Sequence, residues 1–230
     1  MIETRNALIT GASRGLGLAL TGALIADGWR VIADARDGAT LHAALDGLPG
    51  ARLIVGDVTD GKHRKALASL AGEMGGLDAV INNASTLGAT PLPHLLQYPQ
   101  DALEDLFRTN VVAPLMLLQS VQSVLRPGAR IINVSSDAAV EAYEGWGGYG
   151  AGKAALEQIS AVLAVENEHL RIYWVDPGDM RTRMQQDAFP DEDISDRPLP
   201  EESVPGFLAL LNGEHPSGRY AVRDLAPAGV

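Results

Sequence analysis

The chain has 230 residues, no cysteine, and 29 acidic against 18 basic side chains, which gives a formal net charge of -11. The absence of thiols excludes disulfide scaffolds, thiolate zinc sites and cysteine nucleophiles, so we expect no metal centre of that kind. The negative charge disfavours nucleic acids and anionic membranes as partners. The length suits one domain over residues 1–230. Neither a signal peptide nor an apolar run of the roughly 20 residues that span a membrane is visible, so we expect a cytoplasmic protein.

Short apolar runs alternate with longer segments along the chain. Most of these runs are rich in β-branched residues and predict strands at Ala7–Thr10, Val31–Ala33, Leu53–Val55, Ala79–Ile81, Arg130–Val134, Arg171–Val175 and Tyr220–Val222. The segments between them have helical length and spacing, as in Gly15–Asp27, Gly61–Met74 and Asp101–Leu125. This alternation predicts an α/β fold with a parallel sheet that helices cover on both faces.

Two proline-containing regions interrupt the pattern. Ser85–Pro99 is expected to be a loop, and Asp179–Pro205 combines four prolines with a cluster of acids. We expect segment 179–205 to be a mobile loop on the substrate side, although its composition fits a solvated acidic loop equally well.

A glycine-rich turn joins the first predicted strand to the first predicted helix. Gly11, Gly15 and Gly17 let the backbone turn tightly and approach a ligand without a Cβ in the way. The helix that follows offers free N–H groups and a positive dipole end to a pyrophosphate. The turn differs from the commoner G-x-G-x-x-G spacing and from a phosphate loop, but its context between strand and helix predicts a dinucleotide site.

The residues near the end of the second predicted strand bear on the choice of dinucleotide. An acid there holds the ribose hydroxyls of NAD, whereas cations there hold the 2′-phosphate of NADP. Asp34 and Arg36 both lie near this end, and Arg14 lies in the glycine-rich turn. Together the two arginines can clamp a phosphate, to which Ser13 can also donate. We therefore expect NADP(H) to be preferred, with NAD(H) possible.

Tyr149 and Lys153 stand four residues apart at the start of a helical segment, so they share a helix face. A free phenol titrates near pH 10, and a nearby ammonium group lowers that pKa. The pair can thus act as a general acid/base for a carbonyl/alcohol couple. Such a pair also occurs by chance on protein surfaces.

Two other polar residues strengthen this interpretation. Ser136 follows a strand at the sheet edge where α/β proteins bind ligands, and its hydroxyl can polarise a carbonyl. The neighbouring Ser135 suits that position as well. Asn110 lies on the apolar stripe of a predicted helix, either as a hydrogen-bonded core amide or as a residue that positions a water or the lysine.

The motifs occur along the chain in the same order as in the short-chain dehydrogenase/reductase family. The sequence resembles that family over nearly its whole length. The resemblance implies a three-layer, doubly wound Rossmann-type fold with a mainly parallel seven-stranded sheet, and NAD(P)(H)-dependent oxidoreduction. It implies that Tyr149 transfers the proton, that Ser136 binds the substrate oxygen, that Lys153 also holds the nicotinamide ribose, and that Asn110 supports a proton relay. The implied cofactor-binding residues are Gly11, Ser13, Arg14, Gly15, Leu16, Gly17, Arg36, Asp57, Val58, Asn83, Ala84, Tyr149, Lys153, Pro177, Gly178 and Thr182.

The chain departs from the family pattern at three places. Ser85 follows Asn-Asn-Ala where the family has glycine, Gly152 precedes the lysine where serine is frequent, and Asp34 lies beside the expected 2′-phosphate site. None of these changes removes a catalytic group.

We expect reversible hydride transfer between NADPH and a small carbonyl or alcohol substrate. Tyr143 and Trp146 either form an apolar wall of the substrate site or serve as interface or core aromatics. Family members pair through the helices that hold Asn110 and Tyr149, which implies a homodimer or homotetramer. The alternative is an NADP(H)-binding redox sensor or interaction protein without turnover on the same fold.

Overall fold

The sheet confirms the predicted topology. A computed structural model describes residues 4–225, so the two ends of the predicted 1–230 domain, residues 1–3 and 226–230, lie outside the described part. Seven strands form one sheet in the order β3-β2-β1-β4-β5-β6-β7, and every neighbouring pair is parallel. The strands are β1 (Asn6–Thr10), β2 (Arg30–Ala35), β3 (Ala51–Val55), β4 (Leu77–Asn82), β5 (Leu125–Val134), β6 (Arg171–Asp176) and β7 (Gly218–Ala221). Each overlaps a strand expected from the sequence.

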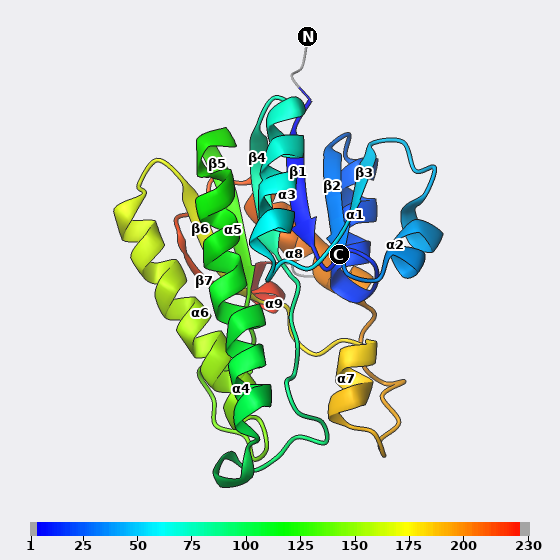
Figure 1. The fold of residues 1–230 in the computed structure, drawn as a ribbon, viewed down its shortest axis with the longest axis vertical. Coiled ribbons are helices and arrows are strands. Elements are labelled where there is room, and N and C mark those ends of the chain that lie inside the picture. The colour runs from blue at the N-terminus through cyan, green and yellow to red at the C-terminus, as the bar shows by residue number, and fades with distance from the viewer. Residues whose placement is uncertain (1–3, 226–230) are drawn as a thin grey trace.

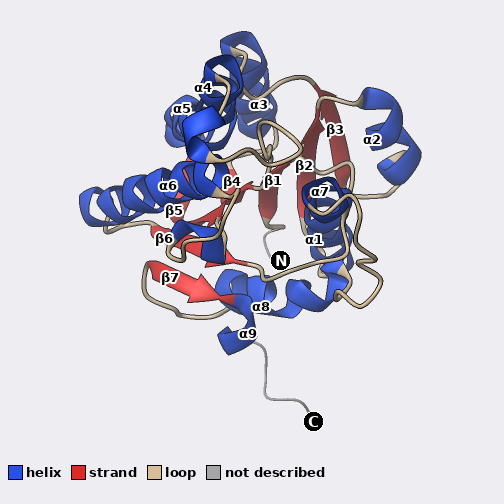
Figure 2. Cartoon of the chain, turned by 90° about the horizontal axis from the view of Figure 1, so that it is seen from below, coloured by secondary structure: helices blue, strands red, loops and turns tan. Residues whose placement is uncertain are grey.

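Helices cover both faces of the sheet, which makes the fold a three-layer Rossmann-type architecture (Figures 1 and 2). One layer contains α3 (Gly61–Glu73), α4 (Gln100–Phe107), α5 (Ala113–Val121) and α6 (Gly147–Glu166). The other contains α1 (Gly15–Ala26), α2 (Gly38–Leu45) and α8 (Pro200–Asn212). Shorter elements are α7 (Arg183–Ala188), α9 (Val222–Leu225), a π-helical turn η2 (Arg108–Val112), and three 3-10 turns, η1 (Leu95–Gln97), η3 (Gln122–Val124) and η4 (Asp137–Ala139).

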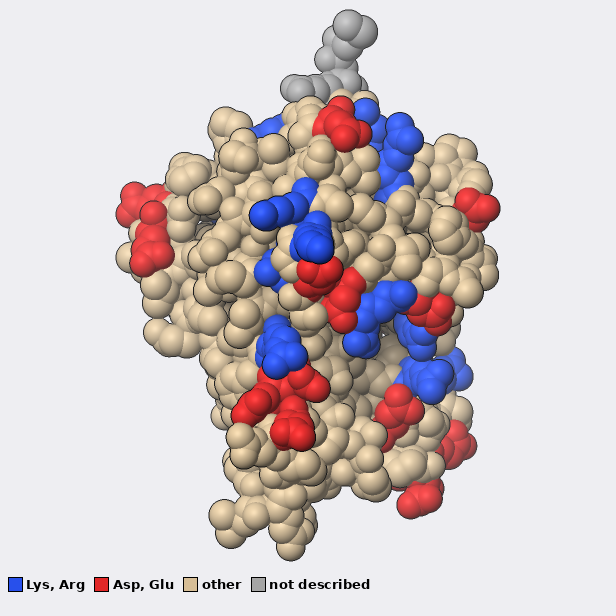
Figure 3. Space-filling model, in the orientation of Figure 1, with Lys and Arg blue, Asp and Glu red and all other residues tan. Residues whose placement is uncertain are grey.

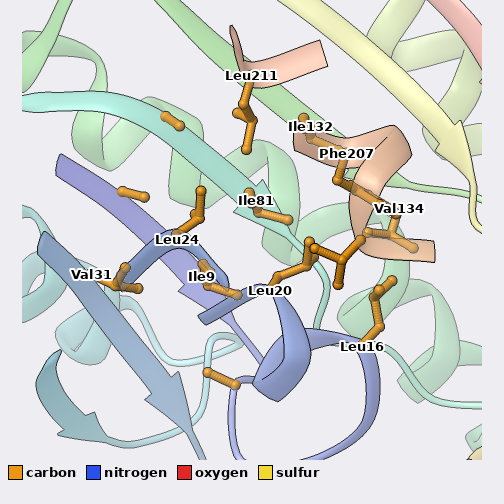
Figure 4. Packing of buried hydrophobic residues seen from close by; sticks show 14 of the residues in the cluster. Ile9, Leu16, Leu20, Leu24, Val31, Ile81, Ile132, Val134, Phe207 and Leu211 are labelled. Carbon is orange, nitrogen blue, oxygen red and sulfur yellow. The ribbon is translucent and has the colours of Figure 1, made fainter. Parts of the chain in front are cut away.

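The core between the sheet and α1 anchors the glycine-rich turn. Leu16, Leu20 and Leu24 recur every four residues and therefore lie on one face of α1. They pack among Ile9 of β1 and Phe207 of α8, and all of these side chains are buried (Figure 4). Because this face is fixed against the sheet, the first turn of α1 is held at the carboxyl end of β1.

Two expectations about secondary structure need correction. The helix expected over Asp101–Leu125 is divided into α4, η2, α5 and η3, because Pro114 has no N–H to donate and its ring crowds the carbonyl of Asn110. The segment 179–205 is not a continuous loop. It contains α7, capped by the Thr182 hydroxyl, and the start of α8, where Pro200 occupies the first helical turn that proline favours. Its mobility stays a prediction.

The surface carries mixed charge. On the face shown in Figure 3, basic and acidic side chains are interspersed rather than gathered into a field of one sign. Within residues 4–225, no helix has the length and apolar character needed to cross a bilayer.

Candidate active site

A large cavity lies at the carboxyl end of the sheet. Its volume of about 1030 Å³ is at the upper end of the range for ligand sites, which leaves room for more than a small substrate. The predicted site residues that line it are Gly11, Ser13, Arg14, Gly15, Leu16, Arg36, Asp57, Val58, Asn83, Ala84, Ser136, Tyr149, Lys153, Pro177, Gly178 and Thr182. Gly17 and Asn110 are not among the lining residues.

The glycine-rich turn owes its shape to glycines at 11, 15 and 17. Gly11 and Gly15 have φ values of 68° and 53°, which residues with a side chain rarely adopt. A Cβ on Gly17 would overlap the backbone oxygen of Gly11 and the side-chain amide of Asn83. Gly17 therefore serves close packing behind the turn rather than the wall of the cavity. Asn83 completes the packing, since its Nδ2 donates to the carbonyls of Thr10 and Gly11.

The first turn of α1 is open toward the cavity. Arg14 occupies the N-cap position, and no side chain caps the free N–H groups of this helix. Uncapped N–H groups at a helix start bind anions well. The site thus fits a diphosphate.

Arg14 and Arg36 both reach the cavity, but each has an acidic neighbour. Arg14 Nη2 lies 3.2 Å from Asp37 Oδ2, and Arg36 Nη1 lies 3.9 Å from Asp57 Oδ2. Hydrogen bonds from Thr40, followed by the weaker effect of Arg14, hold the pKa of the Asp37 carboxyl below its ordinary value. Both ion pairs are partly exposed, so an incoming phosphate can compete for the guanidinium groups.

Tyr149 and Lys153 lie together on the buried face of α6. Tyr149 is 8% exposed and Lys153 is 2% exposed. The Lys153 ammonium lies 5.4 Å from the centre of the Tyr149 ring and donates to the Val134 carbonyl at 2.7 Å. The sequence places the two groups correctly on one helix face.

The pKa values of this pair differ from the simple expectation for neighbouring opposite charges. Burial raises the pKa of Tyr149, and Asp137 and Asp176 add to this effect. Burial also lowers the pKa of Lys153 to about 8, against a smaller opposing effect of Glu157. The reason is desolvation, which penalises the phenolate and the ammonium alike.

Ser135 and Ser136 are distinguished by their partners. The Ser135 hydroxyl donates to Glu157 Oε1 at 2.5 Å. The Ser136 hydroxyl donates to Asp137 Oδ1 at 2.9 Å and accepts from the Ala138 N–H. Because Ser135 is 1% exposed and committed to Glu157, Ser136 is the better placed of the two to meet a substrate.

Asn110 is a buried amide with two backbone partners. Its Oδ1 accepts from the Thr86 N–H at 2.9 Å, and its Nδ2 donates to the Thr86 carbonyl at 2.8 Å. These bonds join η2 to the segment after β4. The described structure gives Asn110 no hydrogen bond to Lys153, so a relay through Asn110 stays a prediction.

The family model described as short chain dehydrogenase matches residues 5–193. The chain belongs to the short-chain dehydrogenase/reductase family. It is similar to the 3-oxoacyl-[acyl-carrier-protein] reductase of rhamnolipid biosynthesis from Pseudomonas aeruginosa, with 33% identity over 78% of this chain and 74% of that protein. It is 34% identical to D-erythrulose reductase from Gallus gallus, over 96% of this chain and 84% of that protein.

A solved structure supports the same family at the level of the fold. A short-chain dehydrogenase from Shigella flexneri, in complex with NADP, has a TM-score of 0.89 and 26% identity, and the match covers 95% of this chain and 97% of that one. This chain is accordingly an oxidoreductase whose family uses NAD or NADP.

This dehydrogenase/reductase has a polar network behind the candidate site that the sequence does not predict. Arg219 of β7 donates through Nε to both Glu157 oxygens, at 3.0 and 3.2 Å, and through Nη2 to the Ser136 carbonyl at 3.2 Å. Glu157 stands four residues after Lys153, so helical spacing could have revealed it. No sequence signal pointed to Arg219.

One wall of the cavity in this short-chain dehydrogenase/reductase is partly aromatic. Trp146 packs edge-on against Tyr149 with ring centres 5.6 Å apart, and against Phe189 at 5.8 Å. The hydroxyl of Tyr143 donates to Asp137 or Glu141, whose carboxylate oxygens lie at 3.0 and 2.8 Å. Trp146, Phe189 and Tyr143 all line the cavity.

Proposed function

We propose that this enzyme transfers a hydride between NADP(H) and a small carbonyl or alcohol substrate, with Tyr149 as the general acid/base. The observation that carries the proposal is the meeting of Tyr149, Lys153 and Ser136 with the glycine-rich turn in one cavity. A proton donor, a hydroxyl for the substrate oxygen and a dinucleotide cradle are the parts that carbonyl reduction requires.

The cradle accounts for the cofactor part. Bound NADP(H) supplies or accepts the hydride. The uncapped start of α1 would hold its diphosphate, and Arg14 with Arg36 would hold its 2′-phosphate. Ser13, Leu16, Asp57, Val58, Asn83, Ala84, Pro177, Gly178 and Thr182 would line the rest of its path. The complex of the Shigella flexneri relative with NADP supports this choice.

The protein groups would divide the proton chemistry. Ser136 would turn its hydroxyl from Asp137 to the substrate oxygen, and Tyr149 would give that oxygen its proton. Lys153 would oppose the charge left on the phenolate. A buried phenol with a raised pKa stays protonated at neutral pH, which is the form that carbonyl reduction requires.

The names of the relatives guide the choice of substrate. The chicken relative is named for a small keto sugar, and so is the L-xylulose reductase from Bos taurus, which is 32% identical over 81% of this chain. The cavity of this chain also offers the carboxylate of Asp137 to substrate hydroxyls. Short polyhydroxy ketones therefore belong in the first substrate panel, beside simple aldehydes, ketones and 3-oxoacyl thioesters.

The test is NADPH oxidation with this panel for wild type, Tyr149→Phe and Tyr98→Phe, with NADH in parallel. Turnover that is lost in Tyr149→Phe and kept in Tyr98→Phe supports the proposal. NADPH binding without turnover on any panel member contradicts it and favours the non-catalytic sensor.

We also propose that two copies of the chain pair through α5 and α6. Val112 in η2, next to α5, and Val162 and Val165 on α6 are 48%, 44% and 77% exposed. Burying these aliphatic groups against a second copy would be favourable. Light scattering at micromolar concentration tests this, because a mass of 24.2 kDa, that of one chain, would contradict it.

A further inference from the structure

Ser85 is a buried hydroxyl without a hydrogen-bond partner. It follows β4 at the carboxyl end of the sheet and lines the cavity. Its Oγ is shielded from solvent and makes no hydrogen bond of good geometry within the described residues. The other described side-chain atoms in this condition are arginine Nε atoms, so Ser85 is the one hydroxyl among them. An unsatisfied buried hydroxyl costs free energy, which indicates that it serves another purpose.

The Ser85 and Tyr149 side chains both line the cavity. The hydrogen-bonding effect of the Ser85 hydroxyl lowers the pKa of Tyr149, although no hydrogen bond of good geometry joins the two groups. Burial, Asp137 of η4 and Asp176 at the end of β6 raise that pKa. Ser85 therefore opposes the groups that disfavour the phenolate.

The other polar groups near Tyr149 already have partners. The Ser136 hydroxyl donates to Asp137, and the Lys153 ammonium donates to the Val134 carbonyl. Ser85 has its donor hydrogen free. It can give that hydrogen to the Tyr149 oxygen without breaking an existing bond.

Asn110 fixes the backbone next to Ser85. Its amide bonds both the N–H and the carbonyl of Thr86, the residue that follows Ser85. Two bonds from one amide restrict rotation of this segment. These bonds thereby fix the backbone next to Ser85 relative to η2, which lies between α4 and α5.

We propose that Ser85 is a further catalytic residue, whose hydroxyl donates a hydrogen bond to the Tyr149 oxygen once that oxygen has lost its proton. The inference rests on the proposed role of Tyr149. In reduction, the phenol O–H bond breaks, its proton goes to the carbonyl oxygen as hydride reaches the carbonyl carbon, and the electron pair stays on the phenolate. Ser85 keeps its own proton throughout, and its hydrogen bond strengthens because the acceptor is now charged.

The kinetic test uses the full-length enzyme saturated with NADP+ and the alcohol of the best panel substrate. Ser85→Ala should lower kcat at neutral pH roughly tenfold and move the alkaline rise of kcat up by about one pH unit, with little change in KM. Ser85→Thr, which keeps a hydroxyl, should recover most of the activity. Ser69→Ala removes an exposed hydroxyl on α3 and serves as the control. An unchanged kcat profile in Ser85→Ala, or an equal loss in Ser85→Thr, overturns the proposal.

A second measurement needs no turnover. In protein labelled at tyrosine 13Cζ, the Tyr149 resonance is the one that Tyr149→Phe removes. Ser85→Ala should shift this resonance, and Ser69→Ala should not. A resonance that stays in place overturns the role of Ser85. Absence of turnover in wild type, with the shift present, instead contradicts the proposed function and leaves the Ser85–Tyr149 contact supported.

Discussion

The Nε2 atom of His63 lies 2.6 Å from a carboxylate oxygen of Asp34, and both side chains are buried. Burial raises the pKa of the Asp34 carboxyl, and the hydrogen bond and charge of His63 oppose that shift. In the sequence, Asp34 indicates NAD and Arg36 indicates NADP, so the two residues give opposite predictions of the dinucleotide. In the structure the Asp34 side chain is 1% exposed and its Oδ1 is bonded to His63 of α3, which disfavours a contact with a ribose.

Breaking this pair should destabilise the fold. In His63→Leu the Asp34 carboxylate loses its partner in a buried place, which should lower the free energy of unfolding by about 3–5 kcal/mol. The double variant His63→Leu/Asp34→Val should recover much of that loss. The matched control is His42→Leu, because His42 and Asp46 form an exposed pair and should contribute under about 1 kcal/mol. Urea unfolding measures all of them, and equal effects of His63→Leu and His42→Leu would refute the argument.

The two arginines should determine the preference for NADPH. Arg14→Ala and Arg36→Ala should each raise the KM for NADPH roughly tenfold or more and leave the KM for NADH nearly unchanged, since only NADPH carries the 2′-phosphate. Arg108→Ala removes an arginine of the α4–η2 region that pairs with Asp105, and it serves as the control. A parallel loss with both cofactors would show that the arginines do not bind the 2′-phosphate.

Asp37 gives the reverse experiment. Its carboxylate lies 3.2 Å from Arg14 and also accepts from the Thr40 N–H at the start of α2. Asp37→Asn keeps a capping oxygen but removes the charge that competes with phosphate. The KM for NADPH should fall in this variant, whereas the KM for NADH should not. A rise with both cofactors would indicate a structural role for Asp37 alone.

Lys153 should make stability depend on alkaline pH. Its pKa is about 8 in the folded protein, against 10.5 for a lysine exposed to solvent, and burial is the main cause. Between these values the unfolded chain holds a proton that the folded chain has lost, so stability rises with pH through this window. Below pH about 8 the folded protein bears the full cost of the buried charge, ~3 kcal/mol.

Lys153→Met removes that charge. Its stability relative to wild type should be highest near pH 7 and should decline by ~3 kcal/mol as the pH rises to about 10.5. The Val134 carbonyl loses its donor in this variant, which lowers the difference at every pH by a constant amount. Lys65→Met, at an exposed position of α3, should show no such slope. Urea unfolding from pH 7 to 10.5 measures this. A difference in the free energy of unfolding between Lys153→Met and wild type that does not change with pH would contradict the prediction of a buried charge.

Two glycines of α1 should respond oppositely to the same substitution. In Gly17→Ala the new methyl group overlaps the Gly11 carbonyl and the Asn83 amide, so the glycine-rich turn must shift. We expect a loss of ~2 kcal/mol or more in stability and weaker NADPH binding. Gly22→Ala meets nothing within 4 Å, and the higher helix propensity of alanine should stabilise it by ~0.5–1 kcal/mol. Thermal unfolding compares them, and equal effects would overturn the packing role of Gly17.

The parts of the site that the sequence predicts correctly are those set by local spacing. Tyr149 and Lys153 share a face because four residues make about one helical turn, and the turn from β1 into α1 follows from its glycines. The parts it does not predict depend on partners far along the chain. His63 is an ordinary helix residue until β2 brings Asp34 beside it, and nothing local to Arg219 indicates Glu157 as its partner.

The secondary structure shows the same division. The periodicity of Asp101–Leu125 is helical throughout, yet Pro114 forces the π-helical turn where Asn110 sits. The prolines of segment 179–205 suggest an irregular loop, but Pro200 begins a helix because its missing N–H is not needed there. In both places the position of the proline within the element determines whether the segment is helical there. The amino-acid composition of the segment does not give that position.

The hydrogen bonds that Arg219 of β7 makes also bear on how the enzyme folds. Arg219 reaches the Ser136 carbonyl across 83 positions of sequence, from a strand that pairs, among residues 4–225, only with β6 at the edge of the sheet. During synthesis, β1 to β6 and the glycine-rich turn leave the ribosome well before Arg219 does. The Ser136 carbonyl therefore lacks this hydrogen bond until β7 has paired with β6. Formation of the candidate active site thus depends on an edge strand that is synthesised long after the residues it supports.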